Sequence, residues 1–414
     1  MGFGLLGEHL RHSYSPRIHG ELGDYPYELF EVAPADLEHF LLHGDFDGLN
    51  VTIPYKKAVL PYCAQLSDTA KVMGCVNTLL RRSDGTLYGD NTDAAGFAWL
   101  LERNGGIGKG EKALVLGSGG ASGTVQVVLR RMGAEVVEIS RKGENNYVNL
   151  ERHADAVLLV NATPVGMYPN NGESPVDLSR LPHLRCVLDL IYNPCRTKLL
   201  LDAEARGLGY ENGLSMLVAQ AKVAAELFTG NAIPDSRCEE ILCKLSQEMQ
   251  NMILIGMPGS GKSTVGRLLA EALHRPFFDA DTKLAKEIGS IPDFIRTHGE
   301  AAFREKETAV LARLGKESGC VIATGGGCVT REENYPLLHQ NGVLVQLHRP
   351  LEQLPTAGRP LSQARPLKEL WAIRAPLYRR FADFTVENCG ELHDTVQQIL
   401  QRRANHEAAD FKRP

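Results

Sequence analysis

The chain has 414 residues, of which 43% are hydrophobic and 23% charged, and a formal net charge of −5. This length is typical of two to four globular domains, and the small negative charge provides no basic field for nucleic acid, which excludes that class of partner. The nine cysteines form no Cys-x-x-Cys pair, which argues against a secreted disulfide scaffold and a zinc ribbon. Neither a signal peptide nor an apolar run near the ~18 residues of a membrane span is found, so we expect a cytoplasmic protein without a membrane partner.

Polar motifs recur along the first 95 residues. They are Ser13-Tyr-Ser15, Asn50-Val-Thr52-Ile-Pro-Tyr-Lys56, Cys75-Val-Asn77-Thr78 and Gly89-Asp90-Asn-Thr-Asp93. We expect the first to lie on an extended segment with both hydroxyls on one side, and the second to follow a strand. A lysine such as Lys56 is usually a solvated surface residue, so a catalytic role for it can be inferred only from the motifs around it.

A glycine-rich turn follows the strand predicted at 113–116. The turn, Gly117-Ser-Gly119-Gly120-Ala-Ser122, leads into a predicted helix at 125–131, which is the pattern of a dinucleotide-binding unit. The next strand, 135–139, is followed by Ser140-Arg141-Lys142. An NAD enzyme usually has an acidic residue here for the ribose 2′-hydroxyl, whereas Arg and Lys attract a 2′-phosphate. The sequence therefore favours NADP(H), unless these two side chains are merely solvated.

The chain then alternates between predicted strands and helices. Core strands are predicted at 157–161 and 187–191, and helices at 214–228 and 238–249. We expect a domain boundary near 247–251 with almost no linker, a second α/β unit over 251–403, and a frayed polar tail over 404–414.

A P-loop opens this second unit. After the strand 252–255, the segment Gly256-Met-Pro-Gly259-Ser260-Gly261-Lys262-Ser263-Thr264 fits G-x-x-x-x-G-K-[ST] in full. Its backbone amides and the following helix suit phosphate. Lys262 would neutralise the β- and γ-phosphates and Ser263 would ligate Mg²⁺.

Charged and glycine-rich motifs follow the P-loop. They are Phe277-Phe-Asp279-Ala-Asp281, Phe303-Arg304-Glu-Lys-Glu307, Thr324-Gly325-Gly326-Gly327, Gly358-Arg359-Pro-Leu361 and Arg374-Ala-Pro-Leu-Tyr378. The period of 2 in a strand predicts that Asp279 and Asp281 point to one side of a strand end. Gly358–Leu361 is typical of a mobile lid. Taken singly, the arginines could instead form surface ion pairs with Glu300, Glu305 or Glu307.

This ordered set resembles shikimate kinase across essentially all of 251–403. The resemblance implies a P-loop nucleoside-monophosphate-kinase-like α/β domain that uses ATP and Mg²⁺. It implies that Asp279 supports the metal with Ser263, and that Asp281 binds substrate hydroxyls as the base. Arg304 and Arg374 would grip a carboxylate beside Gly325, Gly326 and Gly327, while Arg359 would close over the transferring phosphate.

The first 247 residues resemble shikimate dehydrogenase, with Asn161-Ala-Thr163, Tyr192-Asn-Pro and Gly213-Leu-Ser-Met216 among the matching motifs. The resemblance implies that Lys56 and Asp93 are the catalytic pair. It implies substrate contacts from Ser13, Ser15, Thr52, Asn77, Asp93, Tyr192 and Gln220. It implies NADP(H) contacts from Gly117, Ser118, Gly119, Gly120, Ala121, Ser122, Ser140, Arg141, Lys142, Thr163, Gly213 and Met216. Hydride transfer to a ketone leaves an alkoxide, which a lysine can stabilise and protonate while a carboxylate orients it.

Together the resemblances imply an α/β fold with a substrate domain over 1–95 completed by helices in 214–247, a Rossmann domain over 96–213, and the kinase domain. The implied function is that of a bifunctional enzyme of aromatic amino-acid biosynthesis. It would reduce 3-dehydroshikimate to shikimate with NADPH and phosphorylate shikimate to shikimate 3-phosphate with ATP. Two alternatives stay open: a quinate dehydrogenase using NAD, and a non-catalytic sensor of pathway intermediates. The oligomeric state is left open.

Overall fold

The computed structural model describes residues 2–10, 13–354 and 367–410, without the side chains of 406–410. The chain divides into two compact units. Unit 1 comprises Met1–Met167, Glu173–Tyr192 and Asp202–Leu245, and unit 2 comprises Tyr168–Gly172, Asn193–Leu201 and Ser246–Pro414. Among the described residues, no helix has both the length and the apolar character needed to cross a membrane.

The first sheet of unit 1 is mixed, with the strand order β2-β1-β3-β5-β6-β4. Its strands are β1 (Phe3–Gly7), β2 (Tyr27–Glu31), β3 (Gly48–Val51), β4 (Cys63–Leu66), β5 (Thr78–Arg81) and β6 (Leu87–Asp90), and its helices are α1 (Ser15–Leu22), α2 (Leu37–His43) and α3 (Asp68–Met73). Leu49 and Val51 on β3 are buried in one cluster with Leu37 and Leu41 of α2. This apolar packing fixes β3, whose end leads to Lys56.

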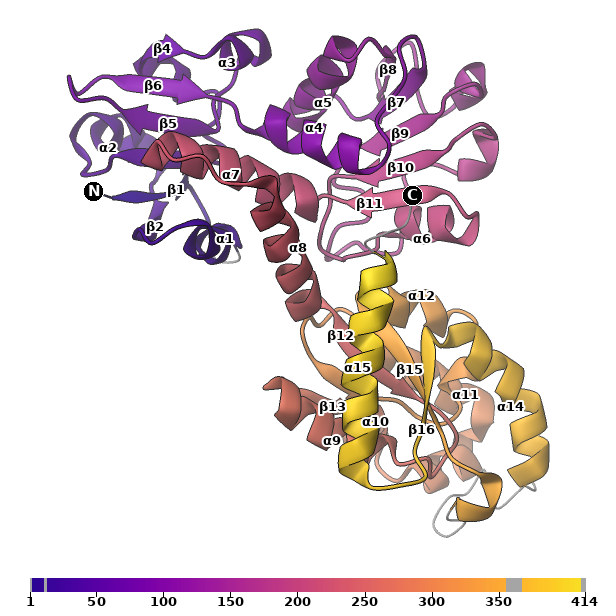
Figure 1. The fold of residues 1–414 in the computed structure, drawn as a ribbon. Coiled ribbons are helices and arrows are strands. Elements are labelled where there is room, and N and C mark those ends of the chain that lie inside the picture. Colours follow the sequence, from indigo (N-terminus) through magenta and orange to yellow (C-terminus); the bar gives the residue numbers. More distant parts are fainter. Residues whose placement is uncertain (1, 11–12, 355–366, 411–414) are drawn as a thin grey trace. The chain divides into compact units, whose positions relative to one another are not determined.

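The second sheet of unit 1 is parallel, with the order β11-β10-β9-β7-β8 (Figure 1). Its strands are β7 (Lys112–Leu116), β8 (Glu135–Ile139), β9 (Leu158–Asn161), β10 (Cys186–Asp189) and β11 (Gly209–Asn212), and the nearby helices are α4 (Asp93–Arg103), α5 (Gly120–Arg131), α6 (Lys198–Ala205) and α7 (Leu214–Thr229). The strand order reverses at β7, between β8 and β9, which is where open α/β sheets bind ligands. The glycine-rich turn lies at this point because it follows β7 directly.

Helices α4 and α7 approach closely at Gly96. A Cβ at this position would lie 2.6 Å from the Met216 carbonyl oxygen and 3.0 Å from Cβ of Gln220. Only a residue without a side chain leaves room for this contact. The close approach brings Gln220 of α7 near the start of α4, where Asp93 lies.

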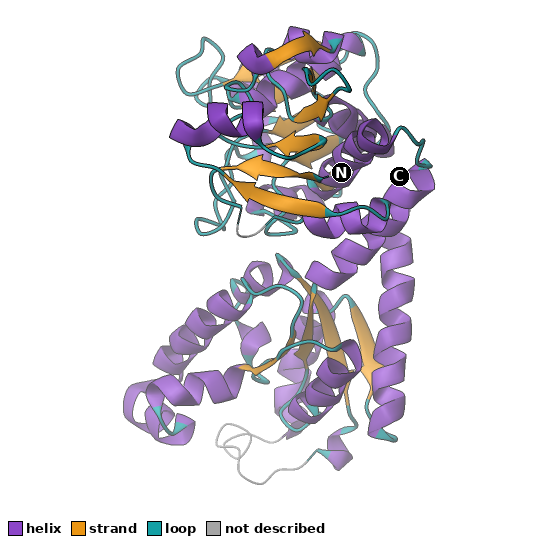
Figure 2. Ribbon diagram, turned by 90° about the vertical axis from the view of Figure 1, so that its left-hand side faces the viewer, coloured by secondary structure: helices purple, strands orange, loops and turns teal. Residues whose placement is uncertain are grey.

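Unit 2 holds a five-stranded parallel sheet with the order β13-β14-β12-β15-β16. The strands are β12 (Asn251–Ile255), β13 (Phe277–Asp279), β14 (Val321–Ala323), β15 (Gly342–His348) and β16 (Phe384–Glu387). The helices are α9 (Lys262–Leu273), α10 (Ala280–Ile288), α11 (Ile291–Leu314), α12 (Asn334–His339), α14 (Leu367–Phe381) and α15 (Leu392–Asp410), with α8 (Asp235–Met249) preceding β12. Alternate residues of β12 enter two different cores, one shared with α9 and α15 and the other with α11 and α14. Helices therefore cover both faces of the sheet (Figure 2).

The predicted α/β fold class is confirmed, and three local predictions were wrong. Asp281 is not on a strand, because β13 ends at Asp279, whose side chain accepts a hydrogen bond from the Thr282 amide and so begins α10. Ser15 is not extended, because Pro16 starts helix α1 there. The chain is helical to Asp410 rather than frayed from residue 404, and Arg403 of this helix donates to the Gln247 carbonyl at 2.6 Å.

Candidate active sites

Lys56 and Asp93 form an ion pair in unit 1. Nζ of Lys56 lies 2.6 Å from Oδ2 of Asp93. The backbone around the lysine is fixed, because the Lys56 carbonyl accepts a hydrogen bond from the Val76 amide and the adjoining Tyr55 is buried. Burial opposes the charge of the ammonium, but the Asp93 carboxylate outweighs this effect and raises the pKa of Lys56 above its ordinary value. The lysine is therefore a cation at neutral pH.

Thr92, the residue before Asp93, connects two predicted substrate-binding side chains. Its amide donates to Oδ1 of Asn77 at 2.7 Å, and its hydroxyl lies 3.4 Å from Oε1 of Gln220. All three side chains are buried. Sequence reasoning gave Thr92 no role, although it stands in the Gly-Asp-Asn-Thr-Asp motif. Because Thr92 also precedes the first residue of α4, this network fixes the position of Asp93.

The remaining predicted substrate residues are less closely connected. Oγ of Ser13 donates to Oγ of Ser15 at 3.1 Å, so the two hydroxyls meet as expected. The ring of Tyr192 packs edge-on against that of Tyr14. Burial raises the pKa of the Tyr192 hydroxyl. The Thr52 amide donates to the Leu6 carbonyl, which joins the loop after β3 to β1. No described hydrogen bond links the hydroxyl of Thr52 to the other predicted residues.

The glycine-rich turn after β7 has the geometry of a dinucleotide site. Gly117 has a φ of 100°, and a Cβ there would lie 3.0 Å from Cγ2 of Thr163. The Ser122 hydroxyl donates to the Gly117 carbonyl at 2.6 Å, which closes the turn that contains Ser118, Gly119, Gly120 and Ala121. Helix α5 begins at Gly120, so its positive end faces the turn.

Ser140, Arg141 and Lys142 follow the end of β8, next to β7. Arg141 and Lys142 are exposed, and no described carboxylate pairs with either. Gly213 precedes α7, and a Cβ there would collide with the Leu190 carbonyl oxygen at 2.1 Å. Met216, on the first turn of α7, packs against the core of the second sheet. The structure therefore places the predicted cofactor residues at the ends of β7, β8 and β9 and at the start of α7.

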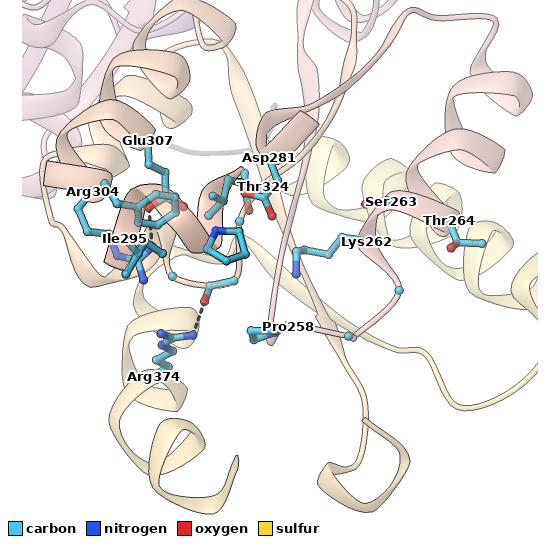
Figure 3. A pocket seen from close by; sticks show the side chains of 18 of the residues that line it. Pro258, Lys262, Ser263, Thr264, Asp281, Ile295, Arg304, Glu307, Thr324 and Arg374 are labelled. Atoms are coloured by element: carbon cyan, nitrogen blue, oxygen red, sulfur yellow. Dashed lines mark hydrogen bonds and ion pairs between the residues drawn. The ribbon is translucent and has the colours of Figure 1, made fainter. Parts of the chain in front are cut away.

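In unit 2 the P-loop borders a cavity of about 570 Å³. Lys262 lies on one side of this cavity and Arg304 on the other, with Asp281 and Thr324 between them (Figure 3). The Lys262 ammonium donates to the carbonyls of Gly256 and Met257 at 2.9 and 3.0 Å. Gly259, Gly261, Ser263 and Thr264 also line the cavity, whereas Ser260 is buried and does not.

A hydroxyl and a carboxylate meet beside the P-loop. Oγ of Ser263 donates to Oδ2 of Asp279 at 2.5 Å. Hard oxygen donors of this kind are the ligands that Mg²⁺ prefers, so this pair fits the metal predicted there. Asp281, two residues further on, is exposed to the cavity from the first turn of α10.

Arg304 reaches the cavity from the second part of α11, which is interrupted at Gly299 (φ 84°). Its Nη1 lies 2.7 Å from Oε2 of Glu307 and its Nη2 lies 3.1 Å from Oε1 of Glu300. Arg304 therefore does pair with Glu300 and Glu307, two of the partners named in the surface ion-pair alternative. However, Arg304 and Glu307 are both buried and line the cavity. Glu307 was not among the predicted site residues.

The three glycines after β14 allow close approaches around the cavity. A Cβ on Gly327 would lie 2.2 Å from Nη2 of Arg304, and one on Gly326 would lie 2.6 Å from Cδ of Pro258 in the P-loop. One on Gly325 would lie 2.4 Å from Oε1 of Glu307. Arg374, on α14, donates to the Gly326 carbonyl at 3.1 Å. Arg359 lies outside the described residues.

The comparisons with known proteins find matches to both parts of the chain. Residues 5–79 match the family model of the shikimate dehydrogenase substrate binding domain, and residues 258–404 match that of shikimate kinase. Shikimate dehydrogenase (NADP(+)) of Methanopyrus kandleri is 38% identical over 265 residues, which cover 56% of this chain and 91% of that protein.

Two solved structures resemble the N-terminal part of the chain. Shikimate 5-dehydrogenase from Thermus thermophilus, in complex with NADP(H) and shikimate, is 35% identical with a TM-score of 0.54, covering 59% of this chain and 99% of that one. Quinate dehydrogenase from Corynebacterium glutamicum, in complex with NAD, is 30% identical with a TM-score of 0.55, also covering 59% and 99%.

A dinucleotide turn with a lysine–carboxylate pair, followed by a P-loop with arginines and carboxylates, defines an oxidoreductase joined to a kinase. The chain belongs to the shikimate dehydrogenase family and continues into a shikimate kinase domain.

Proposed function

We propose that the chain catalyses two successive reactions on one ring acid. The dehydrogenase reduces 3-dehydroshikimate to shikimate with NADPH, and the kinase transfers a phosphoryl group from ATP to the 3-hydroxyl of shikimate. The observation that carries the proposal is that two unrelated folds each hold charged groups suited to the same anionic polyol. These are Lys56 with Asp93 in unit 1, and Asp281 with Arg304 and Arg374 in unit 2.

The dehydrogenase chemistry follows from the ion pair. Bound NADPH would supply the hydride to the carbonyl carbon of the substrate. The Lys56 ammonium stabilises the developing alkoxide and donates the proton that completes the alcohol, while Asp93 orients the ammonium. Ser13 and Ser15 would bind the carboxylate, and Thr52, Asn77, Tyr192 and Gln220 the hydroxyls.

The kinase chemistry depends chiefly on positioning and positive charge. Asp281 accepts the proton of the attacking hydroxyl, and Lys262 stabilises the charge on the phosphates. Ser263 and Asp279 would hold Mg²⁺, which would neutralise charge on the β- and γ-phosphates. Arg304 and Arg374 would bind the substrate carboxylate beside Gly325, Gly326 and Gly327, because guanidinium groups match carboxylate geometry. Arg359 would close over the transferring phosphate.

We place the functional domains at 1–95 with helices from 214–247, at 96–213, and at 251–403. We also assign Gly213 and Met216 to the nicotinamide side of the cofactor, as the family resemblance implies. Arg141 and Lys142 support NADP(H), since two exposed cations without a described partner suit a 2′-phosphate.

A second candidate for unit 1 is oxidation of quinate with NAD, because a quinate dehydrogenase bound to NAD shares this fold at 30% identity. The two candidates differ in both substrate and cofactor. Initial rates with shikimate and quinate, each with NADP⁺ and NAD⁺, distinguish them. A rate with quinate and NAD⁺ above that with shikimate and NADP⁺ would favour the second candidate.

One incubation tests the whole proposal. The purified chain is mixed with 3-dehydroshikimate, NADPH, ATP and Mg²⁺, and the products are followed by ³¹P NMR and mass spectrometry. We expect NADPH to be consumed and shikimate 3-phosphate to accumulate. Consumption of NADPH without a phosphorylated product, or no consumption at all, would refute the corresponding half.

A further inference from the structure

Arg349, a residue that no sequence motif singled out, follows strand β15 at the kinase cavity. Strand β15 pairs with β12 in parallel, with Gln346 opposite Ile255. A Cβ on Gly256, the first glycine of the P-loop, would lie 2.5 Å from the Leu347 carbonyl oxygen. The end of β15 therefore lies against the P-loop. Two residues later, Arg349 lines the cavity that Lys262 also lines.

The backbone on both sides of Arg349 is anchored. The His348 carbonyl accepts a hydrogen bond from the Asn388 amide at 2.8 Å. Pro350 follows and restricts the conformation of Arg349. After Pro350, Leu351 and Leu354 pack into the core that β12 shares with α11 and α14. The side chain of Arg349 thus extends from backbone that is held on both sides, as expected of a group that positions a ligand.

Unlike the other two cavity arginines, Arg349 has no hydrogen-bond or ion-pair partner among the described residues. Arg304 is paired with Glu307 and Glu300, and Arg374 donates to the Gly326 carbonyl. Among the residues that the structure describes, no carboxylate or carbonyl accepts from Arg349, and its Nε is buried without a partner. A buried donor without an acceptor is costly, so its position in a polar cavity indicates an anionic ligand.

We propose that Arg349 binds the triphosphate of ATP, as a further phosphate-binding cation beside Lys262. The inference rests on the proposed kinase function and deepens it. The triphosphate is the fitting anion because Arg349 extends from the strand next to the P-loop strand. The substrate carboxylate is already matched by Arg304 and Arg374. A planar guanidinium with several donors suits two phosphate oxygens at once.

The test compares Arg349→Met and Arg349→Lys with a matched control, Arg380→Met, which removes an exposed arginine of α14 that pairs with Glu332. For each variant, kcat and KM are measured for ATP and for shikimate. The affinity for Mg²⁺-ADP is measured by calorimetry, which does not depend on turnover. Thermal melting and dehydrogenase activity report folding, and Arg349→Lys keeps the test valid if Arg349→Met unfolds.

We expect Arg349→Met to lower kcat/KM for ATP about 10- to 100-fold. It should also weaken ADP binding, while KM for shikimate changes less than about twofold. Arg349→Lys should recover part of the loss, and Arg380→Met should behave as wild type. Unchanged ATP kinetics and ADP affinity in Arg349→Met would overturn the proposal, as would a rise confined to KM for shikimate. A wild-type chain that binds ADP but does not phosphorylate shikimate would refute the proposed function instead, and the ADP affinities would still decide the role of Arg349.

Discussion

The ammonium of Lys56 lies 2.6 Å from the carboxylate of Asp93, although 37 residues separate the two in the chain. Lys56 follows strand β3, whereas Asp93 is the first residue of α4. Two hydrogen bonds help to fix their positions: the Val76 amide donates to the Lys56 carbonyl, and the Thr92 amide donates to Oδ1 of Asn77. Neighbouring residues of one segment, Val76 and Asn77, therefore support both members of the pair.

The pH dependence of ketone reduction should report this ion pair. Lys56 acts as the protonated form, so activity is lost as pH rises through its raised pKa. Asp93→Asn removes the charge that raises the pKa and leaves the burial that lowers it. The alkaline limb of kcat/KM should then move to lower pH, in addition to any fall in rate. The exposed Asp68→Asn serves as the control, and an unmoved alkaline limb in Asp93→Asn would contradict the assignment.

The choice of cofactor should depend on the segment after β8. Replacing Arg141 and Lys142 together by alanine removes the two cations assigned to the 2′-phosphate. We expect kcat/KM for NADPH to fall about 10- to 100-fold, in line with the loss of charged hydrogen bonds, and that for NADH to change little. Arg152→Ala, another exposed arginine in this domain, is the control. Equal losses with both cofactors would rule out the phosphate contact.

Glu307 should hold Arg304 ready for the substrate carboxylate. Its side chain is only 2% exposed, and burial raises its pKa while Arg304 opposes that shift. Glu307→Ala leaves Arg304 with the more exposed Glu300 alone, so unit 2 should lose about 3 kcal/mol of stability. KM for shikimate should rise at least about tenfold. Melting curves and kinase kinetics measure both effects, with the exposed Glu305→Ala on the same helix as control. A wild-type KM in Glu307→Ala would show that the pair has no positioning role.

The sequence predicted those parts of the fold that depend on local patterns. The P-loop and the glycine-rich turn each follow a short buried strand, so a contiguous motif was enough to predict βα units at 113–131 and 252–273. Asp281 was misplaced because strand periodicity was extended beyond Asp279, the residue that ends β13 and caps α10. A capping carboxylate and a strand carboxylate cannot be distinguished by spacing alone.

Residues whose role arises from long-range packing were missed. Thr92 matters because it contacts Gln220, which lies 128 residues further along the chain. Arg349 reaches the kinase cavity because β15 pairs with β12. The residues next to Arg349 in the sequence do not predict that pairing. Glu307 was considered only as an ion-pair partner, since its burial beside Gly325 follows from how α11 packs against the turn after β14.

The most direct test is a pair of single variants in the coupled incubation. Lys56→Ala should leave 3-dehydroshikimate unreduced yet phosphorylate added shikimate at the wild-type rate. Lys262→Met should consume NADPH normally and stop at shikimate. The control variants Lys57→Ala and Lys306→Met, which each replace an exposed lysine of the same unit, should form shikimate 3-phosphate as wild type does. Reduction by Lys56→Ala at the wild-type rate, or shikimate 3-phosphate from Lys262→Met, would contradict the account.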